Sequence, residues 1–214
     1  STAQSVHWAS KVMSVSSEYS DPLLGKEYRA LHILGRPSKY PKFEATPSAW
    51  QSLTPDNPAG EFIIVSFDTA KVIKQVAIFE NFGAGSIVRV DALDENNKLY
   101  LLKEFNSGYA VSNGQLTKIR LSTPTSFKVK SIKISLNSLR VSGYSQLDAV
   151  AISDSDVPIE DKIKIEYDPN AYLVKENLGN TINSKFNEIC PVVSPDGKRL
   201  YFTRWKHPDN LGEM

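Results

Sequence analysis

The stretch EFIIVSFDTAKVIKQVAIFENFGAGSIVRVDAL, residues 61–93, decides the fold. Three apolar runs rich in Val, Ile and Phe occupy residues 62–67, 72–79 and 87–93, and short polar or glycine-containing segments separate them. Apolar runs of this length, bounded by Gly, Asn and Asp, are typical of β-strands. Three consecutive strands predict a meander, and a second sheet has to cover its apolar face. The stretch therefore predicts an all-β protein built as a β-sandwich.

Turn signals and short apolar runs continue after this stretch. Asp-Glu-Asn-Asn at 94–97 predicts a hairpin turn. Further strands are predicted at residues 99–102, 118–121, 127–136 and 147–152. About seven or eight strands at this spacing are typical of a sandwich. The first 20 residues alternate less regularly, and we expect them to form an irregular cover over its edge.

One short helix is expected before the central strands. Residues 26–34 place Tyr28, Leu31 and Leu34 at helical spacing, and Gly35 follows as a stop signal. A long proline-rich loop at residues 36–60 then leads into the first central strand. Loops of this length inside a domain are usually functional or disordered, and the aromatic residues here favour an ordered loop.

The composition narrows the class of function. The 214 residues carry a net charge of +1, so no electrostatic footprint for nucleic acid is visible. No run approaches the roughly 20 apolar residues of a membrane helix. Cys190 is the only cysteine, which excludes an intramolecular disulfide and a cysteine-based zinc cluster. The first residues lack both Met and signal-peptide features, which favours a processed or trimmed chain.

The composition of the sequence changes at Asp154, where an acidic, proline-containing segment begins. It contains one candidate edge strand at residues 163–167. Two short strands follow at 189–193 and 199–203, joined by Ser-Pro-Asp-Gly, which suits a type I turn. The sequence therefore predicts three regions: a β-sandwich at 1–153, a linker at 154–177 and a C-terminal hairpin unit at 178–214.

The first region resembles a known family in several pieces that occur in order. These are SSEY (16–19), EYRALHILGRP (27–37), EFIIVSFD (61–68), VAIFENFGAGSIVRVDALD (76–94) and QLDAVAIS (146–153). They resemble the galactose-binding-like, discoidin-type jelly-roll family over roughly residues 5–153. The resemblance implies a jelly-roll β-sandwich that binds a ligand, and members of this family bind sugars, lipids or proteins.

The C-terminal region carries a second resemblance. The segment LGNTINSKFNEICPVVSPDGKRLYFTRW, residues 178–205, is similar to the opening blade of a TolB-type β-propeller. The resemblance implies a bacterial cell-envelope protein, periplasmic or associated with the outer membrane, of a kind that often also carries an OmpA-type domain. The chain holds about half of one blade, which cannot bury both faces. We expect its free edge to pair with another part of the chain or with a second molecule.

Catalytic motifs are not evident in the sequence. His7, His32 and His207 are far apart, and no Gly-x-Ser-x-Gly elbow occurs. Cys190 precedes a proline inside a predicted strand and is more typical of a small buried residue than of a nucleophile. We therefore predict that the protein is not an enzyme.

The candidate ligand-binding residues are aromatic and polar residues of the predicted loops. Tyr and Trp rings stack on the C–H faces of sugars, while Asn, Arg and Glu hydrogen-bond hydroxyl groups. The candidates are Arg36, Tyr40, Trp50, Glu80, Asn81, Tyr109 and Tyr144. An alternative interpretation places Trp50 in the core and lets Glu80 and Asn81 shape the turn that follows them.

The jelly-roll resemblance also implies a possible structural calcium ion, held by loop carboxylates and backbone carbonyls. The candidate carboxylates are Asp21, Glu44, Asp56 and Asp148. The usual Asp-Gly loop of the family is replaced here by residues 42–47, KFEATP, and solvated loop charges are the alternative.

Two functions follow from these observations. The first is a non-catalytic envelope module that binds a carbohydrate or glycan. The second is an adaptor that holds an envelope protein in an outer-membrane or secretion assembly. Exposed aromatic residues serve both, so the sequence leaves both open.

Overall fold

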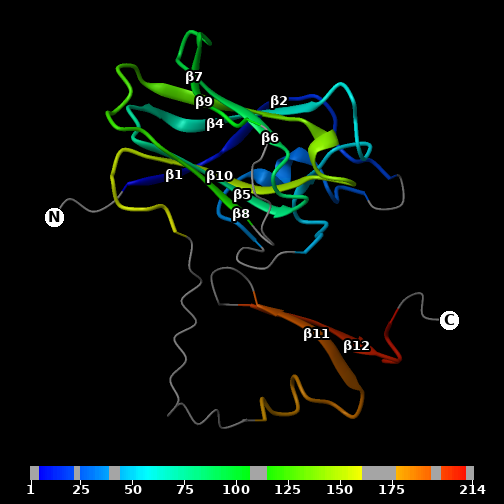
Figure 1. The fold of residues 1–214 in the computed structure, drawn as a ribbon. Helices are drawn as coiled ribbons and strands as arrows, with labels where there is room; N and C mark the ends of the chain where they lie inside the picture. The colour runs from blue at the N-terminus through cyan, green and yellow to red at the C-terminus, as the bar shows by residue number, and fades with distance from the viewer. Residues whose placement is uncertain are drawn as a thin grey trace. The chain divides into compact units, whose positions relative to one another are not determined.

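The computed structural model describes residues 5–21, 25–38, 44–106, 115–160, 177–193 and 199–210. The chain divides into two units, Ser1–Ile163 and Lys164–Met214, here named unit 1 and unit 2. Figure 1 shows that strands dominate both units. Among the described residues, no helix is long and apolar enough to cross a membrane.

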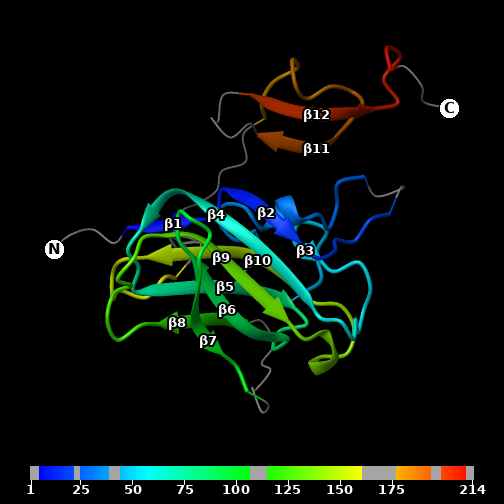
Figure 2. The same ribbon diagram turned by 90° about the horizontal axis from the view of Figure 1, so that it is seen from above.

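Unit 1 is a jelly-roll β-sandwich of two antiparallel sheets, which Figures 1 and 2 show as stacked layers. Sheet A has the order β1-β10-β5-β8, with β3 also paired to β10: β1 (Val6–Trp8), β10 (Gln146–Ser153), β5 (Gln75–Phe82), β8 (Gln115–Arg120) and β3 (Trp50–Gln51). Sheet B has the order β2-β4-β9-β6-β7: β2 (Lys11–Val15), β4 (Glu61–Lys71), β9 (Val129–Leu136), β6 (Ile87–Leu93) and β7 (Leu99–Glu104). Two short 3-10 helices complete the unit: η1 (Ala30–Ile33) and η2 (Ser138–Arg140).

The three central strands exist as β4, β5 and β6, but the predicted meander is wrong. β4 and β6 lie in sheet B, whereas β5 lies in sheet A. β9 separates β4 from β6 and pairs with both, for example through Ile134, which is opposite Ile63 and Val90. An apolar run specifies that a strand has a buried face, and it does not specify its partner.

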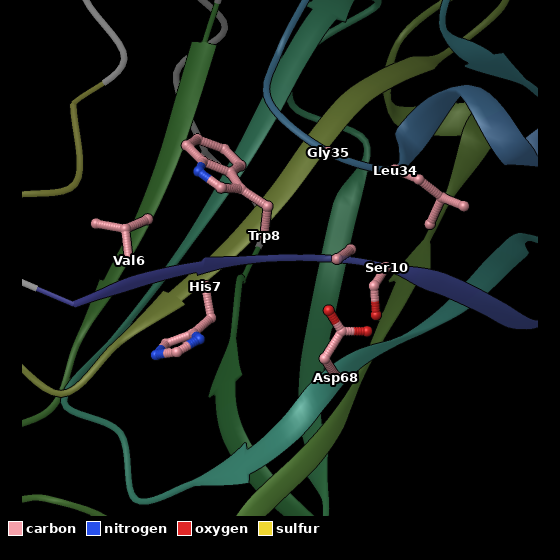
Figure 3. A pocket seen from close by; sticks show the side chains of 8 residues that line it. Val6, His7, Trp8, Ser10, Leu34, Gly35 and Asp68 are labelled. Atoms are coloured by element: carbon pink, nitrogen blue, oxygen red, sulfur yellow. The ribbon is translucent and has the colours of Figure 1, made fainter.

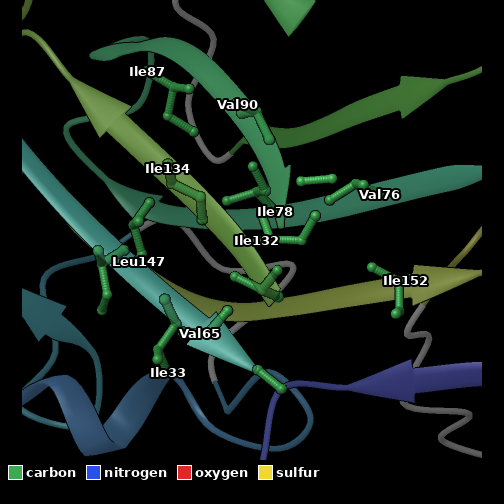
Figure 4. Close-up of a cluster of buried hydrophobic side chains, with 14 of the residues drawn as sticks. Ile33, Val65, Val76, Ile78, Ile87, Val90, Ile132, Ile134, Leu147 and Ile152 are labelled. Atoms are coloured by element: carbon green, nitrogen blue, oxygen red, sulfur yellow. The ribbon is translucent and has the colours of Figure 1, made fainter. Parts of the chain in front are cut away.

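The main core lies between the two sheets. Alternate residues of each strand point inward, as the period of two requires. Ile63, Val65 and Phe67 of β4 alternate in this way and are fully buried. Figure 4 shows inward side chains of both sheets meeting, among them Ile78 of β5 and Ile132 of β9. Burial of such side chains contributes about 1.5–3 kcal/mol each.

The N-terminal residues and the helix differ from expectation. The expected irregular cover contains β1, which pairs with β10, and β2, which pairs with β4. The expected helix over residues 26–34 is only the single turn η1. Tyr28 has a φ of 62°, its N–H donates to Pro47 O (2.8 Å), and its carbonyl accepts from Gln51 N (3.1 Å). Because the Tyr28 N–H and carbonyl bond to a neighbouring segment, they are not available for the hydrogen bonds of a longer helix.

The outer face of sheet A carries a second, smaller core. Phe79, Ala149 and Ala151 are buried there, and Ile159 packs on them. The Gln75 side chain also holds this segment, since its Nε2 donates to Val157 O (2.6 Å) and its Oε1 accepts from Ile159 N (3.2 Å). Residues 154–160, which we expected to begin the linker, therefore pack on the sandwich, and the division between units lies later than the predicted Ser153.

Unit 2 contains the two predicted strands as an antiparallel pair, β11 (Asn187–Val193) and β12 (Leu200–Trp205). Their connecting turn, and the candidate strand at 163–167, lie outside the described residues. One face of the hairpin exposes Ile189, Val192, Tyr201 and Trp205. Cys190, expected to be buried, is exposed and lies where the strand pairing is irregular, between Ile189 and Val192. The propeller, its OmpA-type neighbour and self-association through this hairpin stay predictions.

We expect Ile159→Ala to lower the free energy of unfolding of unit 1 by about 2–5 kcal/mol, because it leaves a cavity against Phe79 and Ala149. Val157→Ala is the matched control, since Val157 is 55% exposed and its loss should change stability little. Urea unfolding of residues 1–163 measures both. Equal stability of the two variants would show that residues 154–160 do not belong to the sandwich.

Candidate functional site

Trp50 lies in the core. It is fully buried, and its Nε1 donates to the carbonyl of Ser17 (3.0 Å). This satisfied indole N–H is what a buried tryptophan requires. The geometry therefore favours the core interpretation of Trp50 over contact with a ligand.

Glu80 is also buried, on the face of β5 that points into the sandwich. One carboxylate oxygen accepts from Thr117 Oγ1, and the other accepts from Gly85 N (2.9 Å). Burial raises the pKa of Glu80, and these two hydrogen bonds lower it in part. Glu80 therefore holds the 83–86 turn through its hydrogen bond with Gly85 N.

Asn81 fastens the long loop to sheet A. Its Nδ2 donates to Gln146 Oε1 (2.8 Å) and to Glu44 O (3.0 Å). Gln146 Oε1 also accepts from Thr46 N (3.0 Å), and its Nε2 donates to Gln51 Oε1 (2.7 Å). This buried network holds residues 44–51 against β5 and β10, so Asn81 supports the loop.

Three tyrosine rings meet at the end of the sandwich where β10 begins. Tyr19 is 5.3 Å from Tyr28 and 6.0 Å from Tyr144, measured between ring centroids, and both pairs are edge-to-face. All three side chains are half-buried. Within the described residues, no hydrogen bond engages any of the three hydroxyl groups. We name these residues the tyrosine cluster and take them as the candidate site.

Backbone contacts position each ring of the tyrosine cluster. Tyr19 N donates to Gln51 O (2.8 Å), and Gln51 N donates to Tyr28 O (3.1 Å). Gly83 has a φ of 61°, and a Cβ there would lie 2.2 Å from Tyr144 O, so only glycine allows this approach. Asp56 Oδ1 accepts from Gly143 N (2.9 Å) and anchors the same segment.

Charged groups flank the rings. Arg29, next to Tyr28, pairs with Glu18, next to Tyr19, at 2.9 Å. Arg29 also donates to Ser20 Oγ (3.1 Å). The exposed Asp56 lies beside the segment of Tyr144. The tyrosine cluster therefore combines aromatic surface with donors and acceptors.

The structure brings together only part of the predicted set. Tyr144 belongs to the tyrosine cluster, whereas Trp50, Glu80 and Asn81 are buried supports. Arg36 is exposed at the start of the 36–60 loop. Tyr40 and Tyr109 lie outside the described residues.

Tyr19 and Tyr28 belong to the candidate site, although the sequence pattern does not indicate them. Helical spacing places Tyr28 on a predicted helix, and Tyr19 falls in the predicted cover over the edge. The Ser-Ser-Glu-Tyr piece before a Gly-Lys turn was the available signal for a loop aromatic residue.

Hydrogen bonds engage the carboxylates of two of the four candidate calcium ligands, Asp148 and Asp56. Asp148 is fully buried and accepts from Ser38 N (2.9 Å) and Ser38 Oγ (2.8 Å), so its carboxylate holds a loop. Asp56 is engaged with Gly143, as described above. Among the described residues, no three His, Cys, Asp or Glu side chains gather where they could hold a metal ion. Calcium binding through Asp21, Glu44, Asp56 and Asp148 stays a prediction.

Solved structures share the fold at low sequence identity. XRCC1 bound to the DNA polymerase β catalytic domain is 12% identical with a TM-score of 0.50, covering 71% of this chain and 99% of that one. Chitosan-binding module 1 of a chitosanase/glucanase from Paenibacillus sp. IK-5 is 13% identical with a TM-score of 0.47, covering 68% and 98%. The family 32 carbohydrate-binding module of C. perfringens NanJ, in complex with galactose, is 13% identical with a TM-score of 0.45, covering 70% and 99%.

These likenesses concern the fold alone. No family model and no curated protein matches the sequence. The jelly-roll β-sandwich expected from the sequence is confirmed.

We expect Glu80 to make stability depend on pH. Its pKa is higher in the folded state than the ordinary 4.5, so the folded chain holds the proton more tightly. The stabilisation by this proton is complete below the unfolded pKa and is lost as pH rises through the folded pKa. The free energy of unfolding of the wild type, relative to Glu80→Gln, should therefore fall from acidic to neutral pH. Urea titrations at several pH values measure it, and a constant difference would contradict the prediction.

Proposed function

We propose that unit 1 is a non-catalytic carbohydrate-binding module and that the tyrosine cluster is its platform. The observation that carries this proposal is the meeting of Tyr19, Tyr28 and Tyr144 at one end of the sandwich, half-buried and with no hydroxyl partner in the described part of the chain. Rings held this way offer preformed apolar surface together with free polar groups.

Sugars suit this chemistry. Their C–H faces stack on aromatic rings, and their hydroxyl groups exchange hydrogen bonds with tyrosine hydroxyls and neighbouring charges. The Arg29–Glu18 pair, which adjoins Tyr28 and Tyr19 in the chain, and Asp56, which accepts from Gly143 next to Tyr144, supply such partners. The loops that carry the rings are fixed by backbone bonds, so little ordering is needed on binding.

The described residues favour binding without catalysis. The carboxyl group with a raised pKa, Glu80, points into the core and is bonded to Thr117 and Gly85. A general acid has to lie within reach of its substrate, and a carboxyl group in the core does not.

An adaptor function is the alternative, because tyrosines are also common hot spots of protein interfaces. The exposed apolar face of unit 2 favours it, since a two-stranded sheet gains stability from a partner. The likeness of residues 178–205 to a propeller repeat supports a bacterial cell-envelope location for either function. The fold itself is shared by sugar-binding and protein-binding structures and does not choose between them.

A glycan array probed with residues 1–163 tests the proposal. We expect binding of some oligosaccharides, reduced at least about tenfold by Tyr19→Ala and by Tyr28→Gly. Tyr28→Gly is informative because glycine suits the positive φ at this position, so loss of the ring is separated from backbone strain. The control is Leu139→Ala, which alters an exposed residue of η2.

No binding across the array, together with capture of an envelope protein that these tyrosine variants lose, would instead favour the adaptor. Sugar binding that survives both variants would place the site elsewhere on the unit.

A further inference from the structure

Two adjoining hollows lie along the edge of unit 1 formed by β1 and β2. The first, of about 500 Å³, is lined by His7, Trp8, Ser10 and Asp68, among others (Figure 3). The second, of about 600 Å³, runs between β2 and η1. Both are bounded by Ser10 and Leu34, so they are neighbours along one path.

The first hollow exists because the chain changes sheets at this edge. β1 pairs with β10 of sheet A, and after Ala9 and Ser10 the chain continues as β2 of sheet B. His7 is opposite Ile152, whose side chain is in the main core, so the His7 side chain lies at the opening between the sheets. Asp68 of β4 lies on the same side of the strand as His7 in Figure 3. Within the described residues, no hydrogen bond or ion pair engages the Asp68 carboxylate.

The second hollow reaches the chain neighbours of two residues of the tyrosine cluster. Its aliphatic lining comes from Val12 and Val15 of β2 and from Leu31 and Leu34 beside them. At its far end stand Glu18 and Arg29, which are the chain neighbours of Tyr19 and Tyr28. β2 has five residues, which span about 17 Å of strand. The path from Asp68 to Glu18 and Arg29 therefore follows the whole length of β2.

We infer that this path is a groove for a linear oligosaccharide, whose end lies on the tyrosine cluster. The inference rests on the proposed carbohydrate function and adds the ligand class: an extended chain, with a single terminal sugar filling only part of the site. Polar groups are spaced along the groove, from Asp68 and His7 through Ser10 and Lys11 to Glu18 and Arg29. They alternate with aliphatic surface, as an amphipathic sugar chain requires.

An extended peptide is the competing occupant, because β2 is an edge strand of sheet B. Two features of β2 oppose strand addition. The pairing of β2 with β4 shifts between Val12 and Ser14, which is a bulge at Met13, and Lys11 stands at the start of the strand. Bulges and lysines on edges discourage a further strand. The side-chain hollow beside β2 remains open to a ligand that needs no backbone pairing.

Calorimetric titration of the full chain with linear β-linked oligosaccharides of N-acetylglucosamine and of galactose, from disaccharide to hexasaccharide, tests the groove. We expect the affinity for the preferred series to rise at least about tenfold with length. Asp68→Ala should remove most of this gain and leave the disaccharide affinity unchanged. Leu31→Gln should do the same, since Leu31 is 47% exposed in the groove, whereas Leu139→Gln, at a residue 60% exposed in η2, should change nothing.

The outcomes separate the two proposals. Disaccharide binding that depends on Tyr19 but does not increase with length would overturn the groove and keep the platform. A gain with length that Asp68→Ala and Leu31→Gln both leave intact would also overturn the groove. Failure of every oligosaccharide to bind would overturn the carbohydrate function itself. Thermal unfolding of each variant shows whether it is folded.

Discussion

The pairing of β9 with both β4 and β6 is the constraint on which the rest of unit 1 depends. It places β4 and β6 in one sheet and leaves β5 to the other, so consecutive strands face each other across the core. Ile63, Val65, Ile132 and Ile134 fill the space between the sheets as a result. Connections that join the two sheets, such as those from β1 to β2, β2 to β3 and β9 to β10, pass an end or an edge of the sandwich, and the candidate site and groove lie at these crossings.

Buried polar groups hold the loops at these crossings in fixed positions. Gln146 and Asn81 hold residues 44–51. Glu61 accepts from Ser17 Oγ (2.8 Å) and Asn57 Nδ2 (2.7 Å) and so joins two loop segments to the start of β4. Such networks are costly when they are incomplete, so they favour a single arrangement of the loops. For this reason, the tyrosine cluster and the groove along β2 are already in place before a ligand binds.

Local pattern predicted the strands well and their partners poorly. The runs around residues 62–67 and 87–93 are strands as expected, because alternation and turn residues are local signals. Pairing is set by contacts far apart in the sequence, such as Val65 with Ile132, so the meander was wrong. Tyr28 was missed for the same reason: its positive φ depends on bonds to Pro47 and Gln51, which no helical pattern reveals. Of the predicted site residues, Tyr144 belongs to the tyrosine cluster. The sequence could predict it because an aromatic residue directly after a turn is a local signal.

The most direct measurement of the central claim is an NMR titration of residues 1–163 labelled at the tyrosine rings, with the oligosaccharide that binds best. If the tyrosine cluster binds the sugar, the ring signals of Tyr19, Tyr28 and Tyr144 will shift together and saturably. Tyr100, which stacks on Phe127 with ring centroids 3.7 Å apart, lies on β7 at the other edge of sheet B and should not shift. Saturable shifts confined to residues away from the three tyrosines would contradict the assignment of the tyrosine cluster as the binding site.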